Sequence, residues 1–235
     1  MPLVILIVFS FNASPFTAWE GISFRWYREM IDDVRLMEGA WNSVLIAVTA
    51  TAAATGIGTL AAYGMWRRRA PLLESSFYLS LVTPEIVTGV SMLAFFQGLF
   101  RYLDVQLGMH TVILAHVAFS APFVVLVVGA RLRTMDRSLE EAAMDLGATQ
   151  WAAFRRVTLP LLAPGIVAAA LLAFTISFDD YVITSLVAGV DSETLPMVIY
   201  GMARRGVSPV VNAISTVIVV GLGVAIVAAQ KLEKA

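Results

Sequence analysis

The stretch LEEAAMDLGATQWAAFRRVTLPLLAPG, residues 139–165, lies between two long apolar runs and is the most polar long segment of the chain. Its residues favour helix, whereas the sequence on both sides is typical of lipid-embedded segments. An ordered polar insert of this kind is most useful when it contacts another molecule. We therefore interpret residues 138–158 as a segment that another protein binds, with an ordinary solvated loop as the alternative.

The insert has the layout of two short helices. The first is predicted over 138–146, with Ser138 as its cap and two glutamates in the first turn, where carboxylates suit the helix dipole. Gly147 ends this helix. A second helical piece over 150–157 ends at Leu159-Pro160, because proline suits the first turn of a following helix.

The composition of the chain indicates a membrane protein. Of its 235 residues, 59% are hydrophobic and 14% are charged, with a mean hydropathy of +0.81, whereas soluble domains carry about 25% charged residues. A net charge of −1 argues against a protein that binds nucleic acid through its phosphates. The absence of cysteine excludes disulfides and thiolate metal sites, and we predict no metal site. We expect His116, one of two histidines, to pack inside a bundle.

Apolar segments predict about six transmembrane helices. The N-terminal segment, residues 1–11, is shorter than the roughly 20 residues that a span needs, so we expect a first helix that begins before this sequence. The other segments cover residues 41–66, 76–100, 111–130, 161–189 and 210–229. They lack the alternating polarity of a transmembrane barrel. We therefore expect an all-α membrane protein with one transmembrane domain over residues 1–235.

Basic residues predict the orientation of the chain. A cytoplasmic C-terminus places 10 of the 16 Lys and Arg residues inside and the other six outside. The inner residues are Arg67, Arg68, Arg69, Arg131, Arg133, Arg137, Arg155, Arg156, Lys231 and Lys234; the outer ones are Arg25, Arg28, Arg35, Arg101, Arg204 and Arg205. The polar insert then lies in the cytoplasm.

Small residues are concentrated in the segment 41–66. Glycine and alanine let neighbouring membrane helices approach closely, so we expect tight helix packing there. The residues concerned are Ala52, Ala53, Ala54, Gly56, Gly58, Ala61 and Ala62.

The insert resembles the signature of inner-membrane subunits of ATP-binding-cassette importers. That signature reads Glu-Ala-Ala, three residues, Gly, nine residues, Ile, one residue, Leu-Pro. Here Glu141 begins the triplet, Gly147 is the glycine, and Leu159-Pro160 closes the motif. Val157 stands where isoleucine is usual, and this keeps a β-branched apolar contact.

The resemblance implies a type I importer permease fold in the bacterial inner membrane, with a cytoplasmic coupling helix that docks on an ATPase dimer. The residues that carry over as ATPase-coupling are Glu141, Ala142, Ala143, Asp145, Gly147, Leu159 and Pro160. The sequence has no G-x-x-x-x-G-K-[ST] phosphate-binding loop. We therefore expect a transport subunit that is not itself an enzyme and has no cofactor, while the partner binds ATP and magnesium.

Within this family the chain is similar to the polyamine branch, in particular the second membrane subunit of spermidine/putrescine importers. The likeness lies in residues 3–27, 83–96 and 177–220 and extends over nearly the whole chain. It implies a second, homologous permease and a periplasmic binding protein that delivers the polyamine. Another amine, an opine or an iron complex is the alternative substrate.

Acidic residues within the apolar segments agree with a cationic substrate. Ionisable groups in a membrane usually face a protein interior or an aqueous path. Glu85 follows a proline in the third segment, and Asp179, Asp180 and Tyr181 lie in the fifth. We predict that these four residues line the substrate path. Each prediction has an alternative. Glu85 could be bonded to a neighbouring helix or protonated, the two aspartates could cap a helix or form a hinge, and Tyr181 could anchor the chain at the membrane surface.

Two other classes of protein compete with the importer. A secondary transporter would explain six spans and buried acids, but not the ordered insert, and no inverted repeat is evident. A membrane-embedded enzyme would need a catalytic constellation, and the sequence shows no nucleophile motif or metal-ligand spacing. Co-purification with an ATPase that depends on Glu141 and Gly147 would favour the importer, whereas proton- or sodium-driven uptake by the chain alone would favour the secondary transporter.

Overall fold

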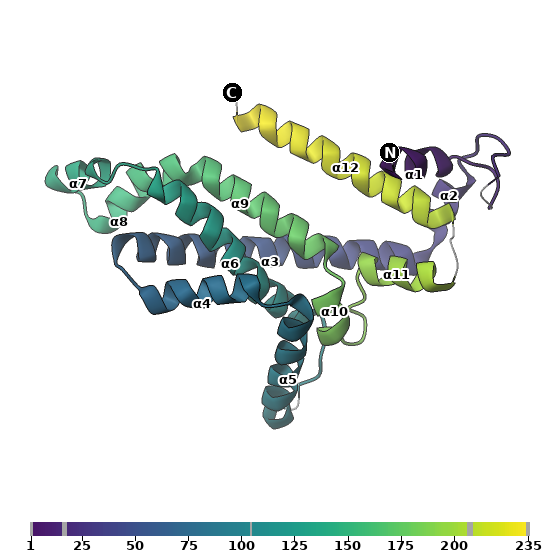
Figure 1. Cartoon of the computed structure of the whole chain (residues 1–235), viewed down its shortest axis with the longest axis horizontal. Coiled ribbons are helices and arrows are strands. Elements are labelled where there is room, and N and C mark those ends of the chain that lie inside the picture. Colours follow the sequence, from purple (N-terminus) through teal and green to yellow (C-terminus); the bar gives the residue numbers. More distant parts are fainter. Residues whose placement is uncertain (1, 16–17, 104, 206–208, 234–235) are drawn as a thin grey trace. The chain divides into compact units, whose positions relative to one another are not determined.

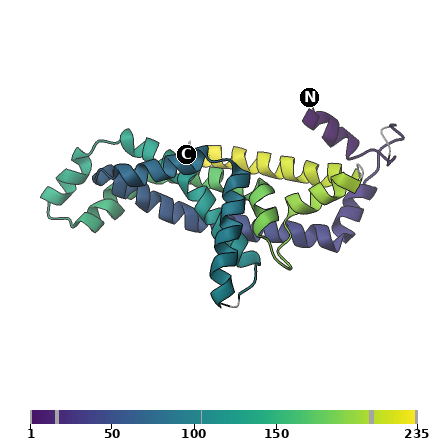
Figure 2. The same cartoon turned by 60° about the horizontal axis from the view of Figure 1, so that its bottom comes forward.

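The computed structural model describes residues 2–15, 18–103, 105–205 and 209–233, and the predicted all-α fold is confirmed (Figures 1 and 2). Over these residues the only pairing of extended backbone is an isolated antiparallel bridge between Asn12 and Ile22. Residue contacts group the chain into two compact units. Unit 1 comprises Met1–Ser43 with Glu193–Ala235, and unit 2 comprises Val44–Ser192.

The helices follow one another closely along the chain. Unit 1 contains α1 (Pro2–Phe9), α2 (Arg25–Asp32), the start of α3 (Val34–Arg67), α11 (Leu195–Arg205) and α12 (Pro209–Glu233). Unit 2 contains the rest of α3, α4 (Pro71–Val82), α5 (Glu85–Leu103), α6 (Met109–Arg133), α7 (Ser138–Asp145), α8 (Gln150–Ala153), the π-helix η1 (Phe154–Thr158), α9 (Leu159–Asp179) and α10 (Val182–Val187).

Four helical runs among the described residues are long and apolar enough to cross a membrane: Val34–Arg67, Glu85–Leu103, Met109–Arg133 and Gln150–Asp179. The expected spans over 41–66 and 111–130 fall within the first and third of these. The expected span over 210–229 falls within α12, which is apolar over Pro209–Gly221. Residues 2–9 of the N-terminal segment form α1.

The bounds predicted for two spans are wrong. The segment 76–100 is two helices, because Thr83 is extended before Pro84 and separates α4 from α5. The segment 161–189 ends as a helix at Asp179, since Asp180 is extended and α10 begins two residues later. Apolar composition alone could not reveal either break.

Some residues used to predict the orientation cannot be placed. Lys234 lies outside the described residues, and the same is true of the side chains of Arg205 and Lys231.

The larger core of unit 2 lies where α6 packs against α9 and α3. Buried aliphatic and alanine side chains fill it: Ala54, Ala62, Ala121, Val124, Val125, Val128, Leu132, Leu162, Ala169 and Ala173. The predicted close approach is confirmed at Gly58, where a Cβ atom would lie 2.6 Å from Val124 Cγ1. Gly56 has open space around it, and Ala52 and Ala53 are exposed, so only one face of α3 packs in this way.

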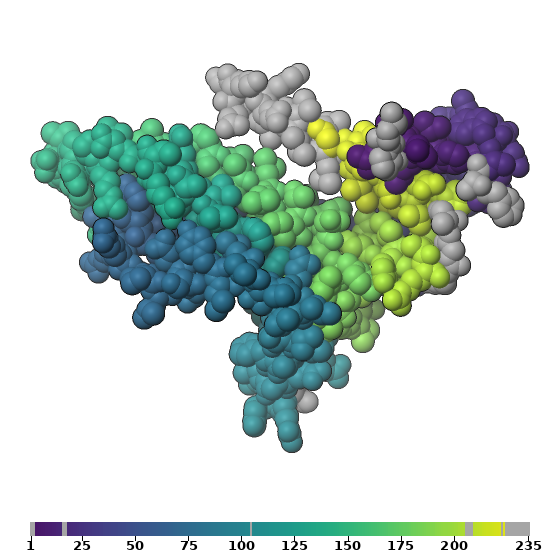
Figure 3. Space-filling view, in the orientation of Figure 1, coloured from purple at the N-terminus to yellow at the C-terminus, as the bar shows by residue number. Residues whose placement is uncertain are grey.

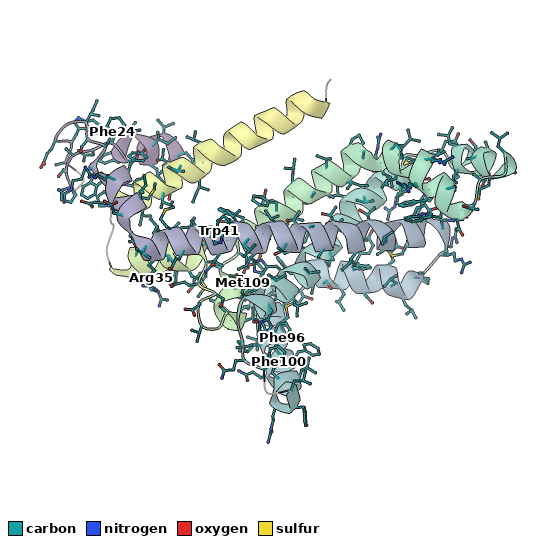
Figure 4. All side chains as sticks on the ribbon, turned by 180° about the vertical axis from the view of Figure 1, so that it is seen from behind. Phe24, Arg35, Trp41, Phe96, Phe100 and Met109 are labelled. Atoms are coloured by element: carbon teal, nitrogen blue, oxygen red, sulfur yellow. The ribbon has the colours of Figure 1, made fainter. Side chains whose placement is uncertain are left out.

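A second core of unit 2 joins α5, α6 and α10. Its buried members include Phe96, Val112 and Ile183, and Phe100 and Met109 pack against them (Figure 4). Gly89 of α5 permits this contact, because a Cβ there would meet Leu186 Cδ1 at 2.6 Å. The interruption of the helix at Asp180 therefore lies directly before α10, which is held by its packing on α5.

Unit 1 is held by polar contacts and by α12 packing on α1 and α2. Arg35, labelled in Figure 4, forms a two-pronged ion pair with Glu193, with N–O distances of 2.5 and 2.7 Å. Ser43 Oγ accepts a hydrogen bond from the backbone N–H of Leu195 at 2.9 Å. These bonds join α3 to the segment that begins α11.

Candidate functional site

The first helix of the insert is confirmed as α7, with one correction at its start. Ser138 is the first residue of the helix and does not cap it; the N-cap position is Arg137, and Asp136 Oδ1 accepts from the Ser138 N–H at 2.9 Å. This turn places the helix start one residue further upstream than a Ser138 cap would. The hydrogen bonds from Ser138 hold the pKa of Asp136 below its usual value. At the other end, Gly147 turns the chain with a φ of +90°, a conformation that favours glycine.

The residues of α7 divide into an outward and an inward side. Glu141, Ala142 and Asp145 are exposed, as is Gly147 after them, and Ala143 is half-buried. Glu140 is only 4% exposed. Figure 3 shows that α7 and α8 form the surface at one end of unit 2, so the outward side of α7 is accessible in this chain.

The second helical piece continues directly into a membrane span. Thr149 caps α8 by accepting from the Ala152 N–H at 3.3 Å. The chain then passes through η1, a rare wide helix, into α9. Leu159, half-buried, and Pro160, exposed, are the first two residues of α9, as predicted for the end of the motif. The motif therefore combines an exposed surface on α7 with the start of a span.

Glu140 binds side chains from two other segments. Its Oε1 accepts from the Tyr63 hydroxyl at 2.7 Å and from Arg67 Nη1, both on α3. Its Oε2 accepts from Thr158 Oγ1 at 2.8 Å, at the end of η1. Sequence reasoning missed this cluster, because nothing in the order of the residues indicates which of two adjacent glutamates turns inward.

Two of the predicted path residues are exposed carboxylates at helix ends. Glu85 is the first residue of α5, and Asp179 is the last residue of α9. Tyr181, half-buried, precedes α10. Helix α5 packs on α10, and only Asp180 and Tyr181 separate α10 from the end of α9. Glu85 and Asp179 therefore lie at the ends of two helices that are both connected to α10, one by packing and the other by the chain.

Asp180 differs from Asp179, because its carboxylate is buried and forms hydrogen bonds with other residues of this chain. It is 8% exposed, and its carboxylate accepts from the backbone N–H groups of Ile183 at 3.3 Å and Thr184 at 2.8 Å. Thr184 Oγ1 adds a bond of 2.7 Å. His116, packed inside the bundle as predicted, places Nε2 3.4 Å from Asp180 Oδ2. The structure thus gives Asp180 the cap role that was one of its alternatives.

Residues 54–232 of the chain match the family described as binding-protein-dependent transport system inner membrane component. The chain is 41% identical over 230 residues to the putrescine transport system permease protein PotI of Escherichia coli (strain K12), covering 95% of this chain and 82% of that protein. It is 38% identical over 238 residues to the spermidine/putrescine transport system permease protein PotC of the same organism, covering 100% and 89%.

The fold also matches a solved structure, a bacterial ABC transporter involved in the import of the acidic polysaccharide alginate. The TM-score is 0.77 at 14% identity, and the match covers 99% of this chain and 88% of that one. At this identity the likeness concerns the fold alone. It agrees with the predicted type I importer permease fold.

Proposed function

This chain belongs to the family of binding-protein-dependent transport system inner membrane components, and we propose that it carries a polyamine across the membrane in an assembly driven by ATP. It is a transmembrane permease subunit of an ATP-binding-cassette importer. In our proposal the hydrolysis of ATP belongs to partner ATPase subunits, which bind the nucleotide and its magnesium.

The outward side of α7 is the proposed contact with the ATPase. The exposed part of the motif, Glu141, Ala142, Asp145 and Gly147, forms a narrow ridge, because alanine and glycine leave little side chain on it. A narrow ridge of this kind suits a groove on the partner with polar side chains at its edge.

The substrate proposed is putrescine or spermidine. The observation that carries it is the similarity to two permeases named for these substrates, which extends over at least 95% of this chain. The negative charge of the exposed carboxylates suits this substrate, since a polyvalent organic cation needs acidic groups along its path. We assign Glu85 and Asp179 to that path, and leave Asp180 as a cap because its bonds are formed within the chain.

The assembly requires further subunits and a defined orientation. We propose a second homologous permease, which completes the path, and a periplasmic binding protein, which delivers the polyamine. We propose that the C-terminus and α7 lie in the cytoplasm of a bacterium. The orientation is supported by the arginines at the ends of α3 and α6 and in η1, which lie at the α7 end of unit 2.

Uptake by the complete assembly tests the proposal. The chain, its second permease, the ATPase and the binding protein are reconstituted in vesicles and supplied with radiolabelled putrescine or spermidine. We expect accumulation that requires ATP and the binding protein. Uptake of an opine or a ferric chelate in place of polyamine contradicts the substrate, whereas polyamine uptake by this chain without ATP contradicts the importer mechanism.

A further inference from the structure

Glu140 stands apart from the coupling motif that follows it. It is the residue immediately before Glu141, but its side chain is 5% exposed and points away from the surface proposed to meet the ATPase. A charged side chain is rarely buried unless it is paired and hydrogen-bonded. The partners of Glu140 therefore indicate what it does.

Three donors from outside α7 surround the Glu140 carboxylate. Tyr63 and Arg67 bind one oxygen, and Thr158 binds the other. Arg67 Nη1 also donates to the Tyr63 hydroxyl at 3.2 Å, so the two α3 side chains support each other. Hydrogen bonds to an ionised group are the stronger kind, so replacing the carboxylate by a neutral amide would weaken the bonds that the three donors make to it.

The donors come from the ends of two membrane helices. Tyr63 and Arg67 form the last turn of α3, and Thr158 is the last residue of η1, directly before α9. An aromatic contact closes the same joint, since the rings of Tyr63 and Phe154 have centroids 4.5 Å apart. Glu140 thus ties α7 to α3 and to α9 at one point.

The segments that connect α7 are short, since residues 134–137 precede the helix and residues 146–149 follow it. Before the helix, Arg137 donates to the Trp66 carbonyl of α3 and its guanidinium lies 4.7 Å from the centroid of the Trp66 ring. After the helix, a Cβ at Gly147 would meet open space.

A helix of eight residues has little stability of its own and depends on packing. Without the Glu140 tie, α7 would keep the Arg137 contact with α3 at its start but would lose its side-chain bonds to Tyr63, Arg67 and Thr158. A force on α7 would then turn the helix about its start before it moved α9.

We propose that Glu140 is a positioning residue that makes α7 move as one body with the adjoining ends of α3 and α9. The displacement of α7 by the ATPase then reaches two membrane helices at once. This inference rests on the proposed function, because it takes the ATPase to be what moves α7. It adds a residue outside the coupling motif and assigns it to transmission within the permease rather than to contact with the partner.

The test measures the distance between α7 and α3 in the complete assembly. The chain has no cysteine, so spin labels are attached to I57C on α3 and L139C on α7, both at exposed positions, with partner subunits freed of cysteine. We expect the same narrow distance distribution with and without ATP in the otherwise unaltered chain. In Glu140→Gln the distribution should broaden and shift when ATP is added.

A second readout is the number of substrate molecules transported per ATP hydrolysed. Glu140→Gln should lower this ratio several-fold, because the displacement of α7 then reaches α3 and α9 incompletely, while the ATPase still co-purifies. Glu74→Gln is the matched control, because it removes the exposed ion pair with Arg133 without touching α7, and we expect it to leave both readouts unchanged. A purely stabilising role of Glu140 would lower the yield of assembly but leave the ratio intact.

Milder variants keep the test decisive if Glu140→Gln does not fold. Thr158→Val and Tyr63→Phe each remove one donor and leave Glu140 paired with Arg67, and we expect intermediate broadening that increases when they are combined. An ATP-independent narrow distance and an unchanged ratio in all variants would overturn the inference. Failure of the proposed function has a different result: a label pair between α7 and the ATPase would show no proximity, or no polyamine would be transported, in the unaltered assembly.

Discussion

His116 Nδ1 lies 2.7 Å from Ser177 Oγ, and this buried contact joins α6 to α9. On the other edge of the ring, Nε2 lies 2.9 Å from Thr184 Oγ1. Thr184 Oγ1 donates its hydrogen to Asp180 Oδ2, so its lone pairs are left to accept from the Nε2–H of His116. A continuous chain of hydrogen bonds therefore holds three helices around the break after Asp179.

Thr184→Val interrupts this chain while keeping the size of the side chain. We expect a loss of about 1–3 kcal/mol in the free energy of unfolding, because the His116 N–H and the Asp180 carboxylate lose a buried partner. Thr175→Val is the control, since that exposed hydroxyl donates only to the Leu171 carbonyl of its own helix. The comparison is made by thermal unfolding in detergent, followed by tryptophan fluorescence. Equal melting temperatures for the two variants would contradict it.

Gly58→Ala should destabilise the packing of α3 on α6, whereas Gly56→Ala should not. An added Cβ at Gly58 would lie 2.6–2.7 Å from atoms of Val124 and 3.2 Å from the Ala121 carbonyl oxygen, while Gly56 has open space. Overpacking costs about 1–3 kcal/mol, and alanine is the better helix former at an open position. The measurement is the melting temperature of each purified variant. The prediction fails if Gly58→Ala is at least as stable as Gly56→Ala.

The sequence predicted the parts of this fold that depend on local pattern. Long apolar runs gave the spans, Gly147 gave the end of α7, and Pro160 gave the start of α9. The break at Pro84 was visible as a proline, but whether a proline kinks a membrane helix or ends it depends on its neighbours: Pro122 lies inside α6 without ending it.

The roles of the buried carboxylates Glu140 and Asp180 could not be predicted, because they depend on contacts that local sequence pattern does not reveal. Glu140 and Glu141 are adjacent and chemically alike, and only the position of α3, more than 70 residues earlier, decides which one is buried. Asp179 and Asp180 show the same problem, since the geometry of the break exposes one and caps α10 with the other. The predicted coupling and path residues remain predictions that mutation must test.

Glu85→Gln and Asp179→Asn should weaken polyamine uptake. Both carboxylates are exposed at helix ends, so neutralising them removes attraction for a cation without leaving a buried donor unpaired. We expect each variant to raise the KM for spermidine several-fold, with co-purification of the ATPase unchanged. Asp32→Asn, an exposed acid of α2 outside the proposed path, is the control. Unchanged uptake kinetics in both path variants would remove these residues from the path.

Substitutions of Gly147 should uncouple ATP hydrolysis from transport in a graded order. Its φ of +90° suits glycine, is tolerated by asparagine better than by alanine, and is closed to proline, whose φ is fixed near −65°. Proline also removes the N–H that donates to the Met144 carbonyl at 2.9 Å at the end of α7. Gly147→Asn should therefore transport nearly normally, Gly147→Ala less well, and Gly147→Pro should hydrolyse ATP with little transport. Uptake and phosphate release are measured on the same vesicles, and normal uptake by Gly147→Pro would count against a coupling role for this turn.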